Sequence, residues 1–131
     1  MTKRANSTLR SAWAQSLIDE LGASHKIKFY DGTQPASTSA SISGPTLLAT
    51  LTADGTPGSV TTGVLTFDAA NYTQSTGSHV NGTPTWVSFT KSDDTRVYEL
   101  AIPTDGMTFT GTIQNGVDIA RGAWTWTAPD A

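Results

Sequence analysis

The stretch PTWVSFTKSDDTRVYELAI, residues 84–102, carries the clearest secondary-structure signal in this chain. Residues 84–91 and 96–102 are rich in β-branched and aromatic side chains, which favour the pleated, half-buried surface of a strand. The acidic pair Asp93-Asp94 between them could indicate a calcium site or a glycosidase carboxylate, but calcium loops gather more oxygen-bearing residues than this one does. The stretch therefore predicts two strands joined by a hairpin loop.

Similar short strands are predicted on both sides of this hairpin. Residues 26–30 (KIKFY) alternate lysine with Ile27 and Phe29, so that one face of the strand is apolar and the other is charged. Five Asn-Gly or Asp-Gly dipeptides lie between the apolar runs, and each favours a tight turn. The other predicted strands are 46–52, 59–67 with Gly63 as a possible bulge, 107–113, 117–120 and 123–127, whereas 33–45 and 68–83 are predicted as mainly loop.

Residues 8–21 (TLRSAWAQSLIDEL) form the one good helix that the sequence predicts. Ser7 is the expected N-cap, and Gly22 is the expected end of the helix. The acidic residues of the last turn oppose the helix dipole, so we expect tertiary contacts to hold this end. The stripe that we expect to be buried comprises Leu9, Trp13, Leu17 and Leu21, with Ile18 beside it.

Composition agrees with a β-rich fold. Charged residues make up 15% of the 131-residue chain, against about a quarter in ordinary domains, and threonine (23 residues) and serine (13) are abundant. Short strands at intervals of about 8–12 residues predict a sandwich. We therefore expect a single domain over 1–131: a flexible basic arm at 1–7, a helix at 8–21 and an all-β, antiparallel β-sandwich at 26–127.

Charge is unevenly distributed along the chain. Residues 1–28 carry five basic and two acidic side chains, a net of +3, whereas residues 29–131 carry three basic and nine acidic ones, a net of −6. The total of −3 gives no support for nucleic-acid binding. Lys3, Arg4 and Arg10 are candidate contacts to an acidic surface, and the alternative is a solvated tail.

Several classes of protein have no support in the sequence. There is no cysteine, and no apolar run approaches the roughly 20 residues of a membrane span. The N-terminus lacks the apolar core of a signal peptide, so we expect a protein made and kept, or assembled, in the cytoplasm. His25 and His79 do not have metal-ligand spacing and are predicted to be surface or loop histidines. No nucleophile elbow, P-loop or dinucleotide fingerprint is present, so we predict no enzyme, metal or cofactor.

Trp86, Trp124 and Trp126 lie in predicted strands, with the last two on one face. A row of tryptophans on a β-sandwich can be a platform on which sugars stack, or it can be core or a subunit contact. The alternation of the sequence favours core or contact.

Five segments follow one another along the chain: LRSA (9–12), IKFYDGTQPA (27–36), TLLATLT (46–52), GTPTWV (82–87) and GAWTWTAP (122–129). Taken in this order, they resemble a widespread group of small structural proteins of tailed phages. The most specific stretches are YDGTQPAS and TLLATLT. The chain departs from the group at Pro84, where the group tends to have alanine, and at Ser88, near the position of an arginine.

The resemblance implies a capsid cement, or decoration, protein with a jelly-roll-like sandwich. Such a protein lies on the outside of a phage head, is assembled in the host cytoplasm, binds the major capsid protein and forms homo-oligomers, here expected to be dimers or trimers. Lys3, Arg4 and Arg10 would then be capsid or subunit contacts. The rival expectation is a tail-tip or fibre module that recognises surface carbohydrate through Trp86, Trp124 and Trp126.

Overall fold

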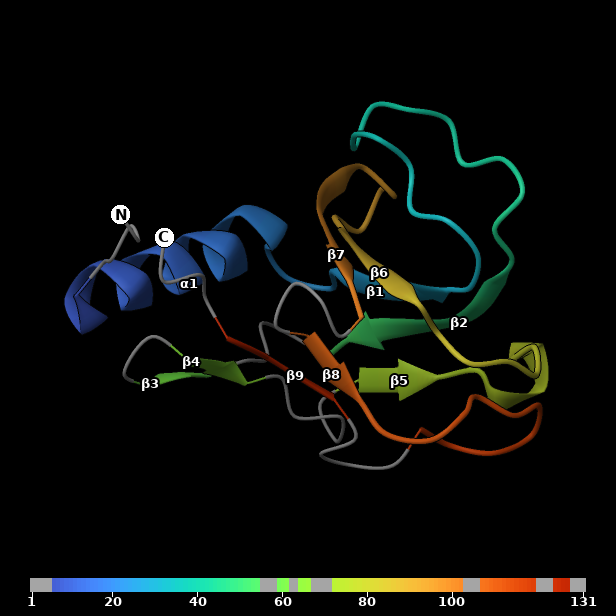
Figure 1. The fold of residues 1–131 in the computed structure, drawn as a ribbon. Helices are drawn as coiled ribbons and strands as arrows, with labels where there is room; N and C mark the ends of the chain where they lie inside the picture. Colours follow the sequence, from blue (N-terminus) through green and yellow to red (C-terminus); the bar gives the residue numbers. More distant parts are fainter. Residues whose placement is uncertain are drawn as a thin grey trace.

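The computed structural model describes residues 6–54, 59–61, 64–66, 72–102, 107–119 and 124–127 (Figure 1). These residues are mostly antiparallel sheet with one helix, α1 (Ser7–Leu21), which confirms that part of the prediction. The larger sheet has the strand order β5 (Tyr72–Gln74), β2 (Leu47–Ala53), β1 (Lys26–Tyr30), β6 (Trp86–Thr90) and β7 (Arg96–Ala101). The smaller sheet has the order β3 (Ser59–Thr61), β4 (Val64–Thr66), β9 (Trp124–Thr127) and β8 (Met107–Phe109).

Strand β1 lies at the centre of the five-stranded sheet and shows the predicted alternation. Ile27 and Phe29 are fully buried, whereas Lys26 and Lys28 lie on the opposite face and are partly exposed. On the neighbouring strand β6, however, all five residues are buried. Both faces of the sheet are therefore covered at β6, because Val87 and Phe89 lie on the side of Ile27 and Phe29 and the other three residues lie on the side of the lysines.

One cluster of buried apolar residues joins the helix to the sheets. Ala14, Ile18 and Leu21 of α1 belong to it, together with side chains from β1, β2, β6 and β7. The rings of Phe29 on β1 and Phe109 on β8 lie 5.2 Å apart, so the two sheets contact each other. The helix lies along β3 and β4 (Figure 1). We call the apolar side of the five-stranded sheet the core face.

The helix has the predicted extent, but its cap and its buried stripe differ from the prediction. Asn6, not Ser7, is the N-cap, and its Oδ1 accepts a hydrogen bond from the backbone N–H of Leu9 at 2.8 Å. Leu9 and Trp13 are 43% and 38% exposed, so their predicted burial is wrong. Residues spaced four apart advance by slightly more than one turn of a helix that has about 3.6 residues per turn. The predicted stripe therefore drifts around the helix and does not stay on one side. The buried residues, Ala14, Ile18 and Leu21, follow the helical period instead.

Three strand predictions also need correction. The single strand expected at 59–67 is a hairpin, because 59–61 pairs antiparallel with 64–66; Gly63 lies outside the described residues. The strand expected at 107–113 ends at Phe109, and Ile113 makes only an isolated bridge with Gly82. Residues 117–119 are loop, not strand. The stretch 68–83, predicted as loop or weak strand, contains β5 and a short 3₁₀ helix, Thr76–Ser78.

Candidate interaction surface

The basic residues proposed as contacts fall at the start of the chain. Lys3 and Arg4 lie outside the described residues. Arg10 lies in the first half of α1 and is partly buried. The structure therefore places one of the three candidates, and it does not leave that one fully exposed.

Trp86 cannot be a platform for sugar stacking. Its side chain is fully buried, and the ring of Tyr30 stacks on it with the centroids 4.4 Å apart. The indole Nε1 donates a hydrogen bond to the backbone oxygen of Asp31 at 3.0 Å. The sugar-binding interpretation is wrong for this residue, because a protein ring already occupies the face that a sugar would need. Trp124 and Trp126 pair with β8 from strand β9, and their side chains lie outside what the structure describes.

Residues 31–46, which we call the β1–β2 loop, form a long excursion beside β7 (Figure 1). Its two ends are tied together, because the Asp31 N–H donates to the Thr46 oxygen at 3.1 Å and the Thr46 N–H donates to Asp31 Oδ1 at 2.6 Å. The hydroxyl of Thr85 donates to the backbone oxygen of Gly32 at 2.8 Å. Loops whose ends meet in this way are compact units that frequently carry function.

Gly32 is required at this neck for two reasons. Its φ of 73° lies in the left-handed region, which glycine adopts at low cost. A Cβ there would also lie 3.3 Å from the Cα of Pro45, closer than ordinary contact. The Asp31-Gly32 pair, predicted to turn the chain, thus also lets the returning end of the loop approach closely.

Arg96 holds the middle of the β1–β2 loop against the sheet. Its guanidinium forms two hydrogen bonds with the carboxylate of Glu99, at 2.8 and 2.9 Å. The same group donates from Nη1 to the backbone oxygen of Ala40 and from Nη2 to that of Ser37 at 3.1 Å. The Glu99 side chain is only 3% exposed, so the guanidinium takes the place of solvent as the partner of this carboxylate. Arginine suits the position because its planar fork can bind a carboxylate and two carbonyls together.

The tip of the loop is held by its backbone and leaves hydroxyl side chains exposed. Ser37, Thr38, Ser39, Ser41 and Ser43 are all exposed. Hydroxyl groups can both donate and accept hydrogen bonds. The loop therefore offers hydroxyl groups on a backbone that is already positioned.

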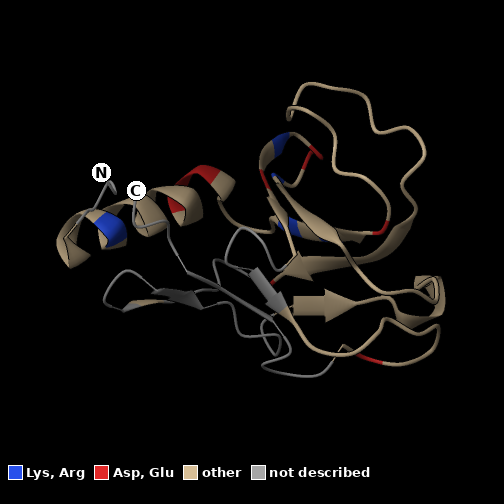
Figure 2. Ribbon diagram, viewed as in Figure 1, with Lys and Arg blue, Asp and Glu red and all other residues tan. Residues whose placement is uncertain are grey.

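The β6–β7 hairpin folds over the side of the five-stranded sheet that lies opposite the core face. We call this side the polar face. Figure 2 colours the basic residues blue and the acidic residues red along the described ribbon. Lys26 Nζ and Lys28 Nζ each lie 2.9 Å from Asp94 Oδ1. These two hydrogen bonds hold the pKa of Asp94 below its usual range. The predicted hairpin is confirmed. Within the described ranges, no three His, Cys, Asp or Glu side chains are grouped to hold a metal ion.

The hairpin also explains the acidic end of the helix. Lys91 Nζ lies 3.0 Å from Glu20 Oε1, so a tertiary ion pair forms where the helix dipole is unfavourable. The expectation that tertiary contacts hold this end of α1 is confirmed.

His25 lies between α1 and β1 and is fully buried, unlike a surface histidine. Its Nδ1 lies 3.1 Å from the Gly22 oxygen, and its Nε2 lies 2.7 Å from the hydroxyl of Tyr72. Because a carbonyl can only accept, Nδ1 carries a proton and Tyr72 donates to Nε2 of the neutral ring. Burial lowers the pKa of His25 and raises the pKa of Tyr72. The arrangement favours a neutral ring.

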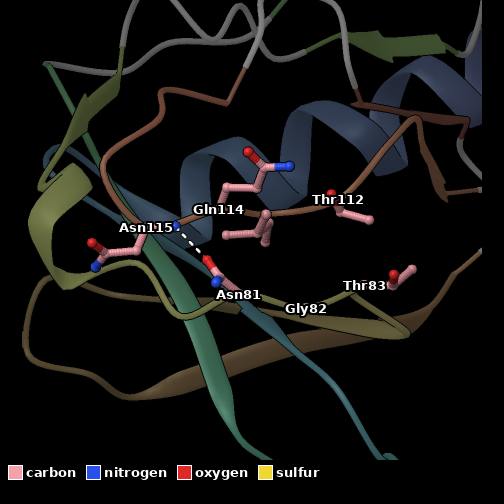
Figure 3. A pocket seen from close by; sticks show the side chains of 7 residues that line it. Asn81, Gly82, Thr83, Thr112, Gln114 and Asn115 are labelled. Carbon is pink, nitrogen blue, oxygen red and sulfur yellow. Dashed lines mark hydrogen bonds between the residues drawn. The ribbon is translucent and has the colours of Figure 1, made fainter.

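A second group of polar residues surrounds an open pocket of about 490 Å³ (Figure 3). It lies where Gly82 and Ile113 form their bridge, and a Cβ at Gly82 would lie 2.9 Å from Leu48 Cδ2. Asn81 Oδ1 accepts a hydrogen bond from the Asn115 N–H at 2.7 Å. Asn81 and Asn115 are at one end of the pocket in Figure 3, and Thr83 and Thr112 are at the other. The lining has no charged side chain, so it suits a neutral polar surface.

Several of these residues could not be identified from sequence. Arg96 and Glu99 are ordinary in a strand, and their pairing depends on a loop more than 50 residues away in the sequence. His25 and His79 are in loops, as predicted, but both are buried. Residues 33–45, predicted to be loop, are loop in the structure, but nothing in that stretch indicates that Arg96 holds it.

Comparison with known proteins gives no match to a family model, a curated protein or a solved structure. In the part of the chain that the structure describes, no helix is long and apolar enough to cross a membrane.

Proposed function

We propose that this chain is a capsid cement (decoration) protein, a non-enzymatic component of a tailed-phage particle. It would be assembled in the host cytoplasm and would bind the lattice of the major capsid protein on the outside of the head. One observation carries the proposal. Three segments that carry the sequence resemblance lie on adjacent strands, β2, β1 and β6, and together they build the neck of the β1–β2 loop.

This arrangement gives the resemblance a physical meaning. Asp31 and Gly32 come from the first segment, Thr46 from the second, and Thr85 and Trp86 from the third. Each contributes a hydrogen bond at the neck of the loop. If the proteins of this group attach through the β1–β2 loop, the segments that they share are expected to include those that position this loop.

A loop that is fixed before binding suits attachment to a repeating surface. Less conformational entropy is lost on binding when the loop backbone is already positioned. Weak contacts that are repeated across a lattice combine into large avidity. The exposed hydroxyl groups of the loop would then bond to polar groups of the major capsid protein.

The helix supplies a second kind of contact. Leu9 and Trp13 are large apolar side chains that remain exposed on one side of α1. We propose that they pack between copies of this chain in a dimer or trimer. The basic arm with Lys3, Arg4 and Arg10 would contact an acidic surface on the shell or a neighbouring copy. Such contacts are screened within about 8–10 Å at ordinary salt, so attachment should weaken as salt rises.

We also propose that the two sheets form a jelly-roll-like sandwich. The contact between Phe29 and Phe109 and the packing of Val60 against the buried cluster support this arrangement.

The copy number and position of this chain in purified particles test the proposal. A cement protein should be present in numbers close to those of the major capsid protein, and cryo-electron microscopy should place it on the outer surface of the head. A tail-tip or fibre module should be present in far fewer copies at the tail. Density only at the tail would overturn the proposal.

A further inference from the structure

A more enclosed pocket of about 310 Å³ lies on the polar face, between β2 and β5. Cross-strand pairing places Thr52 beside Thr73, and both line the pocket. Its lining has two aliphatic residues and no carboxylate, lysine or arginine. The polar residues of the lining are Thr50, Thr52, Thr73, Ser75, Ser78 and His79.

His79 is the unusual member of this lining. Its side chain is 2% exposed, and its Nδ1 lies 3.2 Å from the backbone oxygen of Val117. Because that carbonyl can only accept, Nδ1 carries the donated proton, and in this tautomer Nε2 is an acceptor. Nε2 is buried and has no hydrogen-bond partner, and it is closed to a water-sized probe, so a ligand hydroxyl would reach it only after a small movement of the ring or its neighbours. A buried acceptor without a donor is unfavourable, so a group that donates to Nε2 would stabilise the site.

The ring of His79 is held in place by the segment that follows β8. Val117 accepts from Nδ1, and the side chain of Asn115 donates to the backbone oxygen of His79 at 2.8 Å. Gln74 holds the end of the same segment, because its carboxamide bonds to both backbone groups of Ile119. Val117 therefore fixes the imidazole through Nδ1, and Asn115 fixes the backbone that carries it.

We propose that this pocket binds a small, neutral, polyhydroxylated molecule of monosaccharide size, with one ligand hydroxyl donating to Nε2 of His79. The neutral lining argues against an ion, because a buried charge needs a partner of opposite charge. The hydroxyl groups of the lining match a ligand that offers both donors and acceptors. Thr73 already donates to Asp54 at 3.0 Å, so toward a ligand it is an acceptor. The volume is near the lower end for small-molecule sites, roughly 300–1,000 Å³.

This site is separate from the proposed attachment to a capsid. None of its lining residues belongs to the β1–β2 loop or to the basic arm. Binding of a monosaccharide can therefore be measured on the isolated chain, whatever the outcome for particles.

The test is a titration of the full chain, with the imidazole ¹⁵N resonances of His79 followed by NMR. The probes are glucose, galactose and N-acetylglucosamine, with glycerol as a smaller polyol and inorganic phosphate as an anion. We expect at least one monosaccharide to shift the Nε2 resonance saturably, and phosphate not to do so. The proposal is overturned if no sugar shifts the resonance saturably, which is the result expected if only water bonds to Nε2. It is also overturned if phosphate alone gives a saturable shift.

Two substitutions separate the roles of the two ring nitrogens. His79→Asn can keep the donor to Val117 but lacks Nε2, so binding, now followed by backbone amide shifts, should weaken about three- to tenfold, as for one lost hydrogen bond. His79→Gln can place an acceptor near the Nε2 position and should restore part of the affinity. Thr50→Val keeps the shape of the pocket and removes one lining hydroxyl, and it should weaken binding even if His79 variants do not fold. Thr83→Val, in the other pocket, is the matched control. Unchanged affinity in both His79→Asn and Thr50→Val contradicts the assignment.

Discussion

The two faces of the five-stranded sheet are closed by different physical means. On the core face, Ile27, Phe29 and Phe89 are buried among other apolar side chains, and this burial needs no particular direction. On the polar face, the β1–β2 loop and the β6–β7 hairpin are held by hydrogen bonds and ion pairs that require particular partners. The comparison indicates that the core face provides most of the stability, while the polar face positions the loop.

The largest expected effect is on the core face. Phe89→Ala removes a fully buried ring and should lower the free energy of unfolding by about 3–5 kcal/mol, measured by urea denaturation. Ser88→Ala is the matched control on the opposite face of the same strand. The Ser88 hydroxyl is buried without a hydrogen-bond partner, so its removal should be neutral or slightly stabilising. A larger loss for Ser88→Ala than for Phe89→Ala would break the comparison.

The next effect concerns the Arg96–Glu99 pair. Arg96→Met leaves the buried carboxylate of Glu99 without its partner and should cost about 3 kcal/mol, the lower end for a broken buried pair, because the Arg96 side chain is 16% exposed. It also frees the carbonyls of Ser37 and Ala40, so hydrogen exchange of the loop amides should accelerate beyond the global change.

A double variant separates stability from loop position. Adding Glu99→Gln to Arg96→Met removes the unpaired charge and should recover part of the stability, but the loop should still exchange rapidly. Loop amides that stay as protected as in the unmodified chain would show that Arg96 does not position the loop.

A smaller effect is expected at His25. Burial lowers the pKa of His25 below its ordinary value, so below about pH 6.5 the unfolded chain binds a proton that the folded chain does not. Stability should therefore fall as the pH drops from about 6.5 toward the lowered pKa. His25→Gln should flatten this part of the profile, measured as urea midpoints between pH 7.5 and 5. Equal slopes in both proteins would rule out His25 as the source.

The smallest effect is expected at Asp94. Asp94→Asn removes an exposed charge that pairs with Lys26 and Lys28, and should cost less than about 1 kcal/mol at low salt. Asparagine tolerates the positive φ of 70° at this position, so the backbone should not change. High salt should remove the difference from the unmodified chain, while Asp93→Asn serves as the neighbouring control. A loss that persists at high salt would point to a structural role for the carboxylate.

The difference between the faces also explains what could be predicted from sequence. The alternation of Ile27 and Phe29 with lysines gave the core face, and Gly22 gave the end of the helix. Apolar periodicity reports which side of a strand is buried, and that information is local. It could not distinguish a bulge from a reversal in 59–67, because a glycine permits both.

The polar face could not be predicted, because its partners are distant in sequence. Arg96 bonds to Ser37 and Ala40 on this face, and on the core side His25 bonds to Tyr72 over a similar distance in sequence. No pattern within either segment indicates such a pair. The prediction also failed for Leu9 and Trp13, since their apolar character was taken as evidence of burial. For these two residues, exposure is instead consistent with the proposed contact between copies.

The most direct test of the proposed role compares particles with and without this chain. If the chain is cement, it binds the assembled lattice and stabilises that state by mass action. Particles from a deletion mutant should therefore assemble and adsorb to host cells normally, but release DNA at a lower temperature than complete particles. Normal heat resistance together with lost adsorption would contradict the cement role and favour a receptor-binding role at the tail.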